Sequence, residues 1–253
     1  MSGPAIRALW SVDAAQPPGT ELDDEALTGC YGRSAAPTVR VNFVTSVDGA
    51  VEVDGYSKGL SGPADKRVFG ILRKVCDALL VGAGTMRHEG YRAITLDEPR
   101  RAWRRAQGLA ATPTLVVVSA SLAVDPAAPV FAAAPARPVV LTTAAATAPP
   151  GLDQVADVVR VGEREVDIAA GLAALRARGL DQILCEGGPH LFGTLTAARL
   201  VDELCLTVSP LLAGAKAGRI TAGPHLEGGP EPLRLHHSLL ADDLLLLRYT
   251  RAA

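Results

Sequence analysis

Residues 183–191, which read I-L-C-E-G-G-P-H-L, constrain the fold of this chain more than any other stretch. An apolar run stopped by a charge and two glycines predicts the end of a buried strand, and Pro189 suits the first turn of a helix. A strand that leads directly into a helix is typical of a mainly parallel α/β sheet. Such sheets bind ligands beyond the carboxyl ends of their strands, which is where Glu186 would lie.

The same stretch predicts a binding site with two parts. Gly187 and Gly188 carry no side chains, so the backbone there can approach a phosphate closely. A helix that starts at Pro189 would direct unpaired N–H groups and a positive dipole end at an anion. A carboxylate beside an anion site indicates a ligand with a polar ring and a phosphate. The alternative is an ordinary strand–turn–helix corner with a surface glutamate.

Further apolar runs predict the rest of an α/β domain. Strands are predicted at residues 38–44, 50–53, 77–81, 114–119, 138–142, 155–161, 183–185 and 201–208, and a hairpin at 233–237 and 244–249. Helices are predicted from Ser61 or Gly62 onward, from Asp167 to Gly179, and over residues 191–198. Strands that alternate with helices predict a mainly parallel sheet flanked by helices, with a C-terminal antiparallel hairpin at one edge.

The composition predicts how the chain is divided. Residues 1–36 are rich in proline, glycine, aspartate and alanine and show no long periodicity, which predicts an arm on the surface. Residues 37–253 contain no linker and no repeat, which predicts a single domain. The first ten residues lack the apolar centre of a signal peptide, and no apolar run approaches the roughly 20 residues of a membrane span, so we expect a cytoplasmic protein.

Charge and cysteine patterns argue against several classes of protein. The net charge of −2 gives no general attraction to nucleic acid. The four cysteines lack C-x-x-C spacing and three of them lie in apolar runs, which predicts core residues rather than metal ligands. His236 and His237 are adjacent and would point to opposite faces of a strand, so they would not share a metal. The H-x-E and P-C-x-x-C pattern of nucleobase deaminases is absent.

Polar residues near the first strand and the first helix are candidate ligand contacts. Ser46 and Asp48 follow the first strand, where they either form a turn with Gly49 or face a ligand. In the helix after Pro63, a buried stripe is predicted at Val68, Phe69, Leu72 and Val75. Arg73 lies beside that stripe, either as a surface charge or inside a ligand cleft.

Two further stretches have weaker signals. Residues 82–85, G-A-G-T, follow a strand, but Arg87 occupies the third glycine position of a dinucleotide-binding fingerprint. The stretch therefore indicates only a contact with phosphate or ribose. Residues 98–105, E-P-R-R-A-W-R-R, predict an exposed loop or short helix, and the alternative is a contact with a cofactor 2′-phosphate.

Six motifs occur in the order found in one enzyme family. They are V-T-S-V-D-G (44–49), S-G-P-A-D (61–65), L-L-V-G-A-G-T (79–85), L-C-E-G-G-P (184–189), V-D-E-L (201–204) and P-L-L-A-G (210–214). Together they resemble the RibD C-terminal family, the reductase half of the bifunctional riboflavin-biosynthesis deaminase-reductase, which is related to dihydrofolate reductase. The resemblance covers residues 37–249 and is greatest to the stand-alone actinobacterial pyrimidine reductase-like branch.

This resemblance implies a dihydrofolate reductase-like fold and NADPH as the hydride donor. The implied substrate is 5-amino-6-(5-phosphoribosylamino)uracil, whose ribosyl ring is opened and reduced to a ribityl chain. The resemblance also implies a homodimer formed through residues 201–208 and 210–214. The alternative for that region is that Asp202 and Glu203 simply begin an internal strand.

The resemblance also implies roles for individual residues. The implied cofactor contacts are Val44, Gly82, Gly84, Thr85, Glu89, Gly187, Gly188, Pro189, His190, Leu191 and Phe192. The implied substrate contacts are Arg73, which would meet the phosphate, and Glu186, which would clamp the N–H groups of the pyrimidine. Ser46, at the end of the first strand, is a further candidate substrate contact. Reduction also requires a proton, which an acid with a raised pKa could deliver, and Glu186 and Asp48 are the catalytic candidates.

The chain departs from the family pattern after Thr85. The family has A-D-D-P-x-L-x-x-R, whereas this chain has R-H-E-G-Y-R-A-I-T-L from Arg87 onward. Glu89 can replace one acidic cofactor contact, but Arg92 comes too early to match the second phosphate arginine. A same-fold reductase of another ring, dihydrofolate included, and a non-catalytic nucleotide-binding sensor are therefore alternatives.

Overall fold

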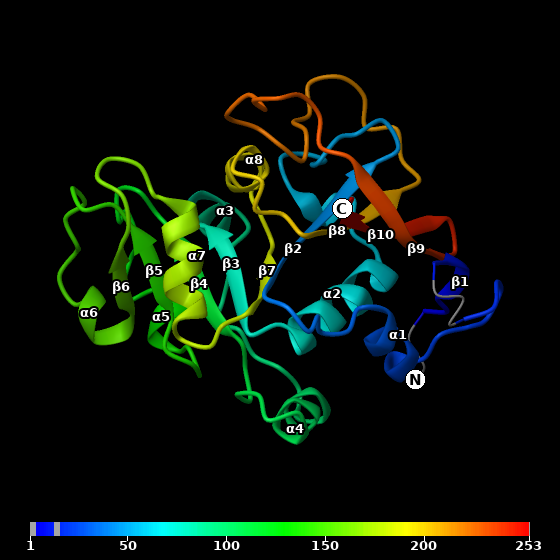
Figure 1. Ribbon diagram of the computed structural model, residues 1–253, viewed down its shortest axis with the longest axis horizontal. Helices are drawn as coiled ribbons and strands as arrows, with labels where there is room; N and C mark the ends of the chain where they lie inside the picture. The colour runs from blue at the N-terminus through cyan, green and yellow to red at the C-terminus, as the bar shows by residue number, and fades with distance from the viewer. Residues whose placement is uncertain (1–3, 13–15, 253) are drawn as a thin grey trace.

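The computed structural model describes residues 4–12 and 16–252, and this part of the chain forms a ten-stranded sheet. The strands lie in the order β1-β9-β10-β8-β2-β7-β3-β4-β5-β6 (Figure 1). Their bounds are β1 (Arg7–Ser11), β2 (Thr38–Ser46), β3 (Ala78–Gly82), β4 (Thr114–Val118), β5 (Val139–Thr142), β6 (Asp157–Arg160), β7 (Gln182–Cys185), β8 (Glu203–Ser209), β9 (Leu233–Ala241) and β10 (Leu244–Arg251). Neighbouring strands from β8 to β6 are parallel, and β10, β9 and β1 extend the sheet antiparallel. The predicted sheet is confirmed.

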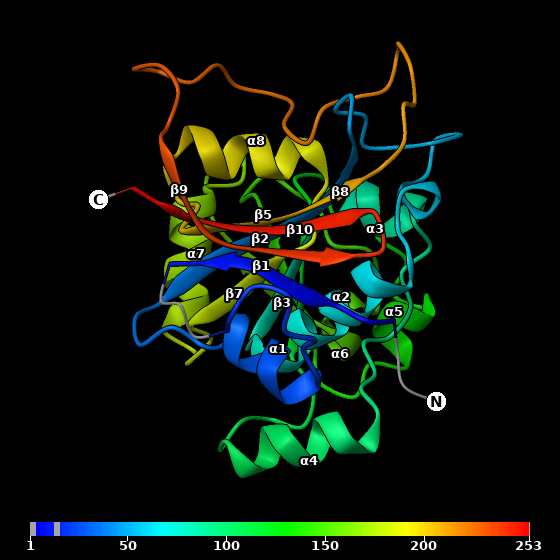
Figure 2. The ribbon, with the colours of Figure 1, turned by 90° about the vertical axis from the view of Figure 1, so that its right-hand side faces the viewer.

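Helices cover both faces of this sheet. They are α1 (Asp24–Cys30), α2 (Pro63–Val75), α3 (Ala83–His88), α4 (Glu98–Ala106), α5 (Pro129–Ala132), α6 (Leu152–Val155), α7 (Ile168–Arg176) and α8 (Pro189–Ala197), with a 3₁₀ turn at Ser57–Gly59. Helices α7 and α8 pack on one face, and α1, α2, α3, α5 and α6 pack on the other. Figure 2 shows α8 and α1 on opposite sides of the sheet. Among the described residues, no helix has the length and apolar character needed to cross a membrane.

The central strands are continuous apolar runs because both of their faces are buried. In β3, Leu79 and Val81 pack in the cluster under α3, α5 and α6, whereas Leu80 packs in the cluster under α7 and α8. Successive side chains of a parallel strand point to opposite faces of the sheet. Both faces are buried here, so both sets of side chains are apolar.

The predicted helix starts are confirmed, with one change in the buried stripe of α2. Gly62 caps α2 ahead of Pro63, and the Asp167 carboxylate caps α7 by accepting from the Ala170 N–H at 2.9 Å. In α2, Ile71 rather than Phe69 joins the other predicted stripe residues in the core. Phe69 is half-buried and lines a cavity described below.

The N-terminal segment differs from the predicted surface arm. Strand β1 pairs with β9, and Ile6, Leu22 and Leu27 are at most 1% exposed in the core cluster that also contains α2. Strand β1 and helix α1 are short, so their sequences show no long periodicity. Packing against the rest of the protein stabilises them. Parts of the predicted arm, residues 1–3 and 13–15, lie outside the described residues. A division of the chain at residue 37 stays a prediction.

The prediction of a short strand at residues 50–53 is wrong. Val53 and Tyr56 exchange two backbone hydrogen bonds of 3.0 and 3.1 Å, which closes a tight turn. Asp54 and Gly55 occupy the centre of that turn with φ of 52° and 80°. Aspartate and glycine tolerate this left-handed backbone, so the chain reverses where the strand would have continued.

The arginine-rich residues 98–105 form helix α4, as one of the two interpretations predicted. Arg101 and Arg105 pair with Glu98 on the surface, and the buried Arg104 donates to main-chain carbonyls just before β3. The helix therefore lies at the amino ends of the parallel strands, opposite the glycine-rich turns (Figure 1). This position does not support the alternative of a cofactor 2′-phosphate contact.

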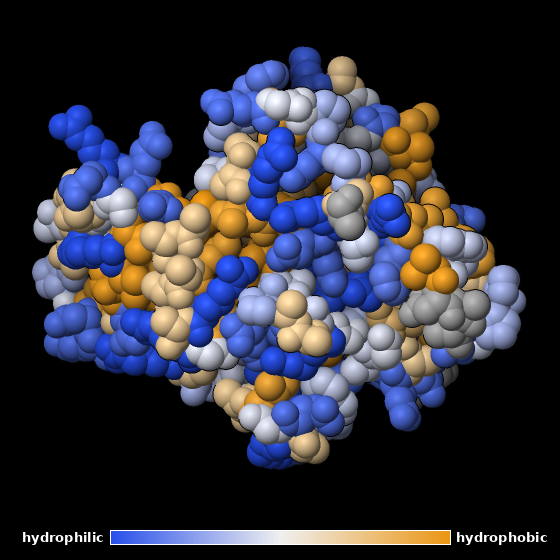
Figure 3. Space-filling view, viewed as in Figure 1, coloured by the Kyte–Doolittle hydropathy of each residue, from blue (hydrophilic) through white to orange (hydrophobic). Residues whose placement is uncertain are grey.

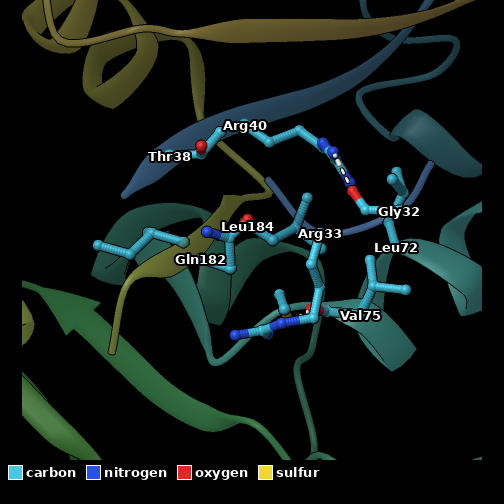
Figure 4. Close-up of a pocket in the computed structure, with 10 residues that line it drawn as sticks. Gly32, Arg33, Thr38, Arg40, Leu72, Val75, Gln182 and Leu184 are labelled. Carbon is cyan, nitrogen blue, oxygen red and sulfur yellow. Dashed lines mark hydrogen bonds between the residues drawn. The ribbon is translucent and has the colours of Figure 1, made fainter. Parts of the chain in front are cut away.

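Three charged side chains form a buried cluster where β2, β8 and β10 lie side by side. Glu203 accepts from Arg40 Nε at 2.6 Å and from Arg248 Nη2 at 2.7 Å. Other N–H groups of the two arginines donate to the carbonyls of residues 30–32, and Figure 4 shows Arg40 reaching Gly32. Burial alone would raise the Glu203 pKa, but the two arginines hold it below its ordinary value. The cluster connects the segment after α1 to the sheet.

Candidate active site

A cavity of about 680 Å³ opens beyond the carboxyl ends of β3 and β7 and beside the last residues of β2. Its wall is completed by α2, the start of α8 and the segments that follow β2 and α3. This volume is within the range of ligand pockets in proteins. A much smaller space of about 10 Å³, lined by Arg33 and Arg40, has room for no more than one water molecule (Figure 4).

Glu186 lies at the end of β7, as predicted, and is held by two other side chains. Arg73 donates from Nε to Oε1 and from Nη2 to Oε2, both at 2.7 Å, and the Tyr91 hydroxyl donates to Oε2 at 2.9 Å. The Glu186 side chain is only 1% exposed, whereas that of Arg73 is 22% exposed. A larger fraction of the arginine side chain than of the carboxylate is therefore exposed to the cavity.

Burial and charge both shift the pKa values of Tyr91 and Arg73, the two partners of Glu186. Burial raises the pKa of the Tyr91 hydroxyl well above its ordinary value, and the Glu186 charge adds to that effect. Burial would lower the Arg73 pKa, but the Glu186 carboxylate outweighs it and raises the pKa above its ordinary value. Arg73 also lies over the Phe69 ring, 4.2 Å from its centroid. The arginine is consequently a fixed cation and the tyrosine a fixed hydrogen-bond donor.

The glycine-rich junctions where β3 meets α3 and β7 leads into α8 lie beside this carboxylate. The Gly82 N–H donates to the Gly187 carbonyl at 2.9 Å, and a Cβ placed on Gly188 would lie 2.3 Å from Thr85 Oγ1. The Gly187–Gly188 peptide is cis. A side chain at Gly188 would therefore collide with Thr85, and Gly187 has a φ of 96°, which favours glycine.

Helix α8 begins at this contact. Pro189 has no N–H, and the Phe192 N–H donates to the Gly188 carbonyl at 3.0 Å. The N–H groups of His190 and Leu191 fall in the first turn, where a helix supplies no acceptors, so they can bind an anion. The side chains of Leu191 and Phe192 instead pack in the core, with Phe192 stacked on Phe43.

Most of the predicted cofactor contacts come together. Those that line the cavity are Val44, Gly84, Thr85, Glu89, Gly188, Pro189 and His190. Gly82 and Gly187 support the glycine contact from behind the cavity wall. The Glu89 carboxylate accepts from the Ser57 N–H at 3.2 Å and so joins the two segments at the cavity mouth.

Ser46 and Asp48 do not line the cavity. The Ser46 hydroxyl donates to Asp48 and accepts from the Ala50 N–H, and it is almost completely buried. Asp48 also accepts from the N–H groups of Ala213 and Gly214 at 3.1 and 2.8 Å. These residues form the turn that was the alternative interpretation, and they join it to the loop after β8.

The hydrogen bonds of Asp48 lower its pKa. Donation from Ser46, followed by the two N–H groups of the loop, lowers the Asp48 pKa to about 2. A group with this pKa is ionised at neutral pH and holds no proton to donate. Asp48 therefore fits a structural role better than the predicted role of proton donor.

Tyr91 and the cavity position of Phe69 were not predicted. Tyr91 lies in the stretch after Arg87 where the chain departs from the family pattern, so no motif indicated it. The one available signal was an isolated aromatic residue in a polar segment. The spacing of Phe69 matches the apolar stripe of its helix, which predicts a core position instead of a place in the cavity wall.

A matched pair of glycine substitutions tests the packing of α8. A Cβ on Gly193 would lie 2.0 Å from the Ala222 carbonyl oxygen, whereas one on Gly29 of α1 would meet nothing within 4 Å. We expect Gly193→Ala to destabilise the protein by about 1–3 kcal/mol, since backbone must move. Gly29→Ala should be neutral or stabilising by up to about 1 kcal/mol. Urea unfolding measures both, and equal effects would contradict the packing.

The sequence is similar to one protein family and to several characterised proteins. The family model described as the RibD C-terminal domain matches residues 37–244. The 2,5-diamino-6-ribosylamino-4(3H)-pyrimidinone 5′-phosphate reductase of Methanothermobacter thermautotrophicus is 28% identical over 221 residues, which cover 85% of this chain and 98% of that protein. The riboflavin biosynthesis protein RibD of Mycobacterium tuberculosis is 28% identical over 192 residues, which cover 75% of this chain and 46% of that protein.

A solved structure agrees with this result. A pyrimidine reductase-like protein from Corynebacterium diphtheriae superimposes with a TM-score of 0.76 at 25% identity, covering 86% of this chain and 92% of that one. The predicted dihydrofolate reductase-like fold class, with its parallel sheet and C-terminal hairpin, is confirmed.

Proposed function

The chain belongs to the RibD C-terminal domain family, and from this premise we propose that it is the NADPH-dependent reductase of riboflavin biosynthesis. It is an oxidoreductase of the pyrimidine reductase type. The proposed substrate is 5-amino-6-(5-phosphoribosylamino)uracil, whose ribosyl group becomes a ribityl chain. The family match begins at residue 37, which supports a reductase domain over residues 37–253. The cytoplasmic location remains a prediction.

One observation carries this proposal. Glu186, held by Arg73 and Tyr91, lines the same cavity as the glycine contact that begins α8, and Gly188 follows Glu186 by two residues. The first suits a polar ring, and the second suits the phosphates of a cofactor. A reductase requires both ligands in contact, whereas a sensor of a nucleotide alone would not need the buried ionic group.

The residues present fit a nicotinamide cofactor, and we propose NADPH as its form. Gly84, Gly188 and the first turn of α8 would hold the pyrophosphate, because they line the cavity where the first-turn N–H groups of α8 lack helical acceptors. Val44 and Thr85 line the cavity near this contact and would face the rest of the cofactor. When bound, the reduced nicotinamide supplies a hydride to the substrate. The protein contributes orientation and excludes water.

The phosphate of the substrate needs cations that lack a carboxylate partner. Lys58, Lys66 and Arg92 line the cavity, and none of them forms an ion pair within the described residues. We assign the substrate phosphate to this group. The proton that accompanies the hydride would not come from Asp48, which is ionised at neutral pH.

Oxidation of NADPH by the purified protein tests the proposed function. The uracil substrate and dihydrofolate are offered separately, and we expect turnover of the uracil compound with little or none of dihydrofolate. Preference for dihydrofolate would leave the fold and cofactor site intact but change the substrate. Tight NADPH binding without turnover of either compound would favour the non-catalytic sensor.

We also propose a homodimer, with an interface that differs in detail from the predicted one. Strand β8 lies between β2 and β10, so its edges are occupied, as the alternative interpretation of Asp202 and Glu203 held. Leu212 is 82% exposed and lies beside the exposed Leu211 and Val47, whose main chains are hydrogen bonded. Apolar surface also extends over the antiparallel strands (Figure 3). Such a surface is typical of an interface.

Light scattering measures the proposed assembly. We expect the mass of two chains for the wild type and of one chain for Leu212→Glu, because a buried charge without a partner opposes association. Leu212→Met keeps an apolar side chain at the same position and is the control, which should remain a dimer. A wild-type mass of one chain would contradict the homodimer.

A further inference from the structure

The group that faces the substrate in the Glu186 corner is an arginine, and the carboxylate lies behind it. The Glu186 side chain is 1% exposed, and both of its oxygens accept hydrogen bonds from Arg73, one of them also from Tyr91. A carboxylate has about four acceptor positions, and three are filled here. Arg73 keeps donors that Glu186 does not use, including both hydrogens of Nη1, and is 22% exposed at the cavity wall.

We propose that Arg73 donates hydrogen bonds to a carbonyl oxygen of the pyrimidine ring, and that Glu186 and Tyr91 are positioning residues for it. This inference rests on the proposed function, since it identifies how the same site recognises its ring. It reverses the roles implied by the resemblance, in which Glu186 meets the ring and Arg73 meets the phosphate.

Charge favours the ring carbonyl over the phosphate at Arg73. The guanidinium forms a bidentate ion pair with Glu186, so the pair has no net charge and offers directed donors rather than a strong field. A dianionic phosphate placed there would also lie next to a carboxylate. Lys58, Lys66 and Arg92 line the same cavity without ion-pair partners in the described residues, and they suit a phosphate better.

The surroundings of Arg73 fix the direction of its free donors. The Arg73 Cζ atom lies 4.2 Å from the centroid of the Phe69 ring. The edge of the guanidinium that carries Nε and Nη2 donates two hydrogen bonds to Glu186. Tyr91 fixes the carboxylate in turn, which leaves the guanidinium little freedom to rotate. A donor held in this way costs little entropy when it binds a flat, polar ring.

Binding of two substrate fragments tests the proposal without requiring turnover. The fragments are 5,6-diaminouracil, which has the ring alone, and ribose 5-phosphate, which has the phosphate alone. Both are titrated into the NADPH-loaded protein and followed by NMR. We expect Arg73→Lys to weaken diaminouracil binding on the order of 30-fold, the loss typical of a directed hydrogen bond to a charged donor, and to leave ribose 5-phosphate within two-fold.

A second variant and a control separate positioning from folding. Tyr91→Phe removes one hydroxyl and keeps the ring, and we expect about a five-fold loss of diaminouracil affinity with unchanged ribose 5-phosphate and NADPH affinities. Arg137→Lys makes the same change in a surface ion pair with Asp157 and should alter neither fragment. Equal melting temperatures for the variants confirm that folding is intact.

Several results would overturn the proposal. Loss of ribose 5-phosphate binding alone in Arg73→Lys would assign this arginine to the phosphate, and unchanged binding of both fragments would remove it from the site. Failure of the wild type to bind diaminouracil would also contradict it. If the fragments bind as expected but the uracil substrate is not turned over, the ring contact stands and the proposed function fails.

Discussion

Glu203→Ala is expected to destabilise the protein by about 3–5 kcal/mol, the loss typical of removing one partner from a buried ion pair. Arg40 and Arg248 would then face each other without a counter-charge, although their contacts with the carbonyls of residues 30–32 would remain. Exposure of these three side chains is about one-tenth or less, so water cannot screen the two cations. Urea unfolding at neutral pH measures the change.

The surface of the protein provides a matched control. Asp157 also pairs with two arginines, Arg137 and Arg178, but all three side chains are 40% or more exposed. Asp157→Ala should therefore cost no more than about 1 kcal/mol. Similar losses in the two variants would show that burial of the Glu203 cluster does not determine its contribution.

The pH dependence of stability follows from the same cluster. The folded-state pKa of Glu203 is lowered, so its contribution is fully present above the unfolded-state pKa and is lost as pH falls through the folded-state pKa. Between neutral pH and strongly acid pH, the wild type should lose this part of its stability. Glu203→Gln lacks the titrating group, and its stability should change less over the same range. An equal acid dependence of both proteins would contradict the role of Glu203.

Glu186→Gln is expected to lower kcat/KM for the pyrimidine on the order of 100-fold while NADPH affinity changes less than two-fold. Glutamine keeps one acceptor oxygen but places an N–H donor against Arg73, whose Nε and Nη2 both need acceptors. The guanidinium would turn away, and the ring would lose its oriented contact. Steady-state kinetics and fluorescence titration of NADPH measure the two quantities.

The matched control for this prediction is Glu98→Gln. Glu98 also accepts from two arginines, Arg101 and Arg105, but it lies on α4, away from the cavity, and is exposed. Its substitution should leave both constants unchanged. If Glu186→Gln instead abolished NADPH binding, the division of this corner into a substrate part and a cofactor part would be wrong.

The sequence predicted the structure best where a local pattern of residues has a single structural cause. Continuous apolar runs predicted the central strands because both faces of those strands are buried. The glycine pair and Pro189 predicted the start of α8 because a side chain at Gly188 would collide with Thr85. These signals are local, so they require no knowledge of distant segments.

The sequence was least informative where distant segments meet. Arg73, Tyr91 and Glu186 come from three separate segments of the chain, and their hydrogen bonds span 95 to 113 residues of sequence. Nothing local distinguishes Arg73 on Glu186 from Arg73 on a phosphate. Strand β1 was likewise missed because it is stabilised by pairing with β9, more than 200 residues away, rather than by its own pattern.

The order of strands in the sheet has a consequence during synthesis. Strand β2 emerges early from the ribosome, yet its two neighbours, β7 and β8, are encoded only at residues 182–209. Until then both edges of β2 lack their partners, and unpaired strands favour association with other chains. The floor of the cavity is completed only when β7 inserts between β2 and β3. The nascent chain therefore acquires its ligand site late, and cofactor present in the cell can stabilise only the nearly finished protein.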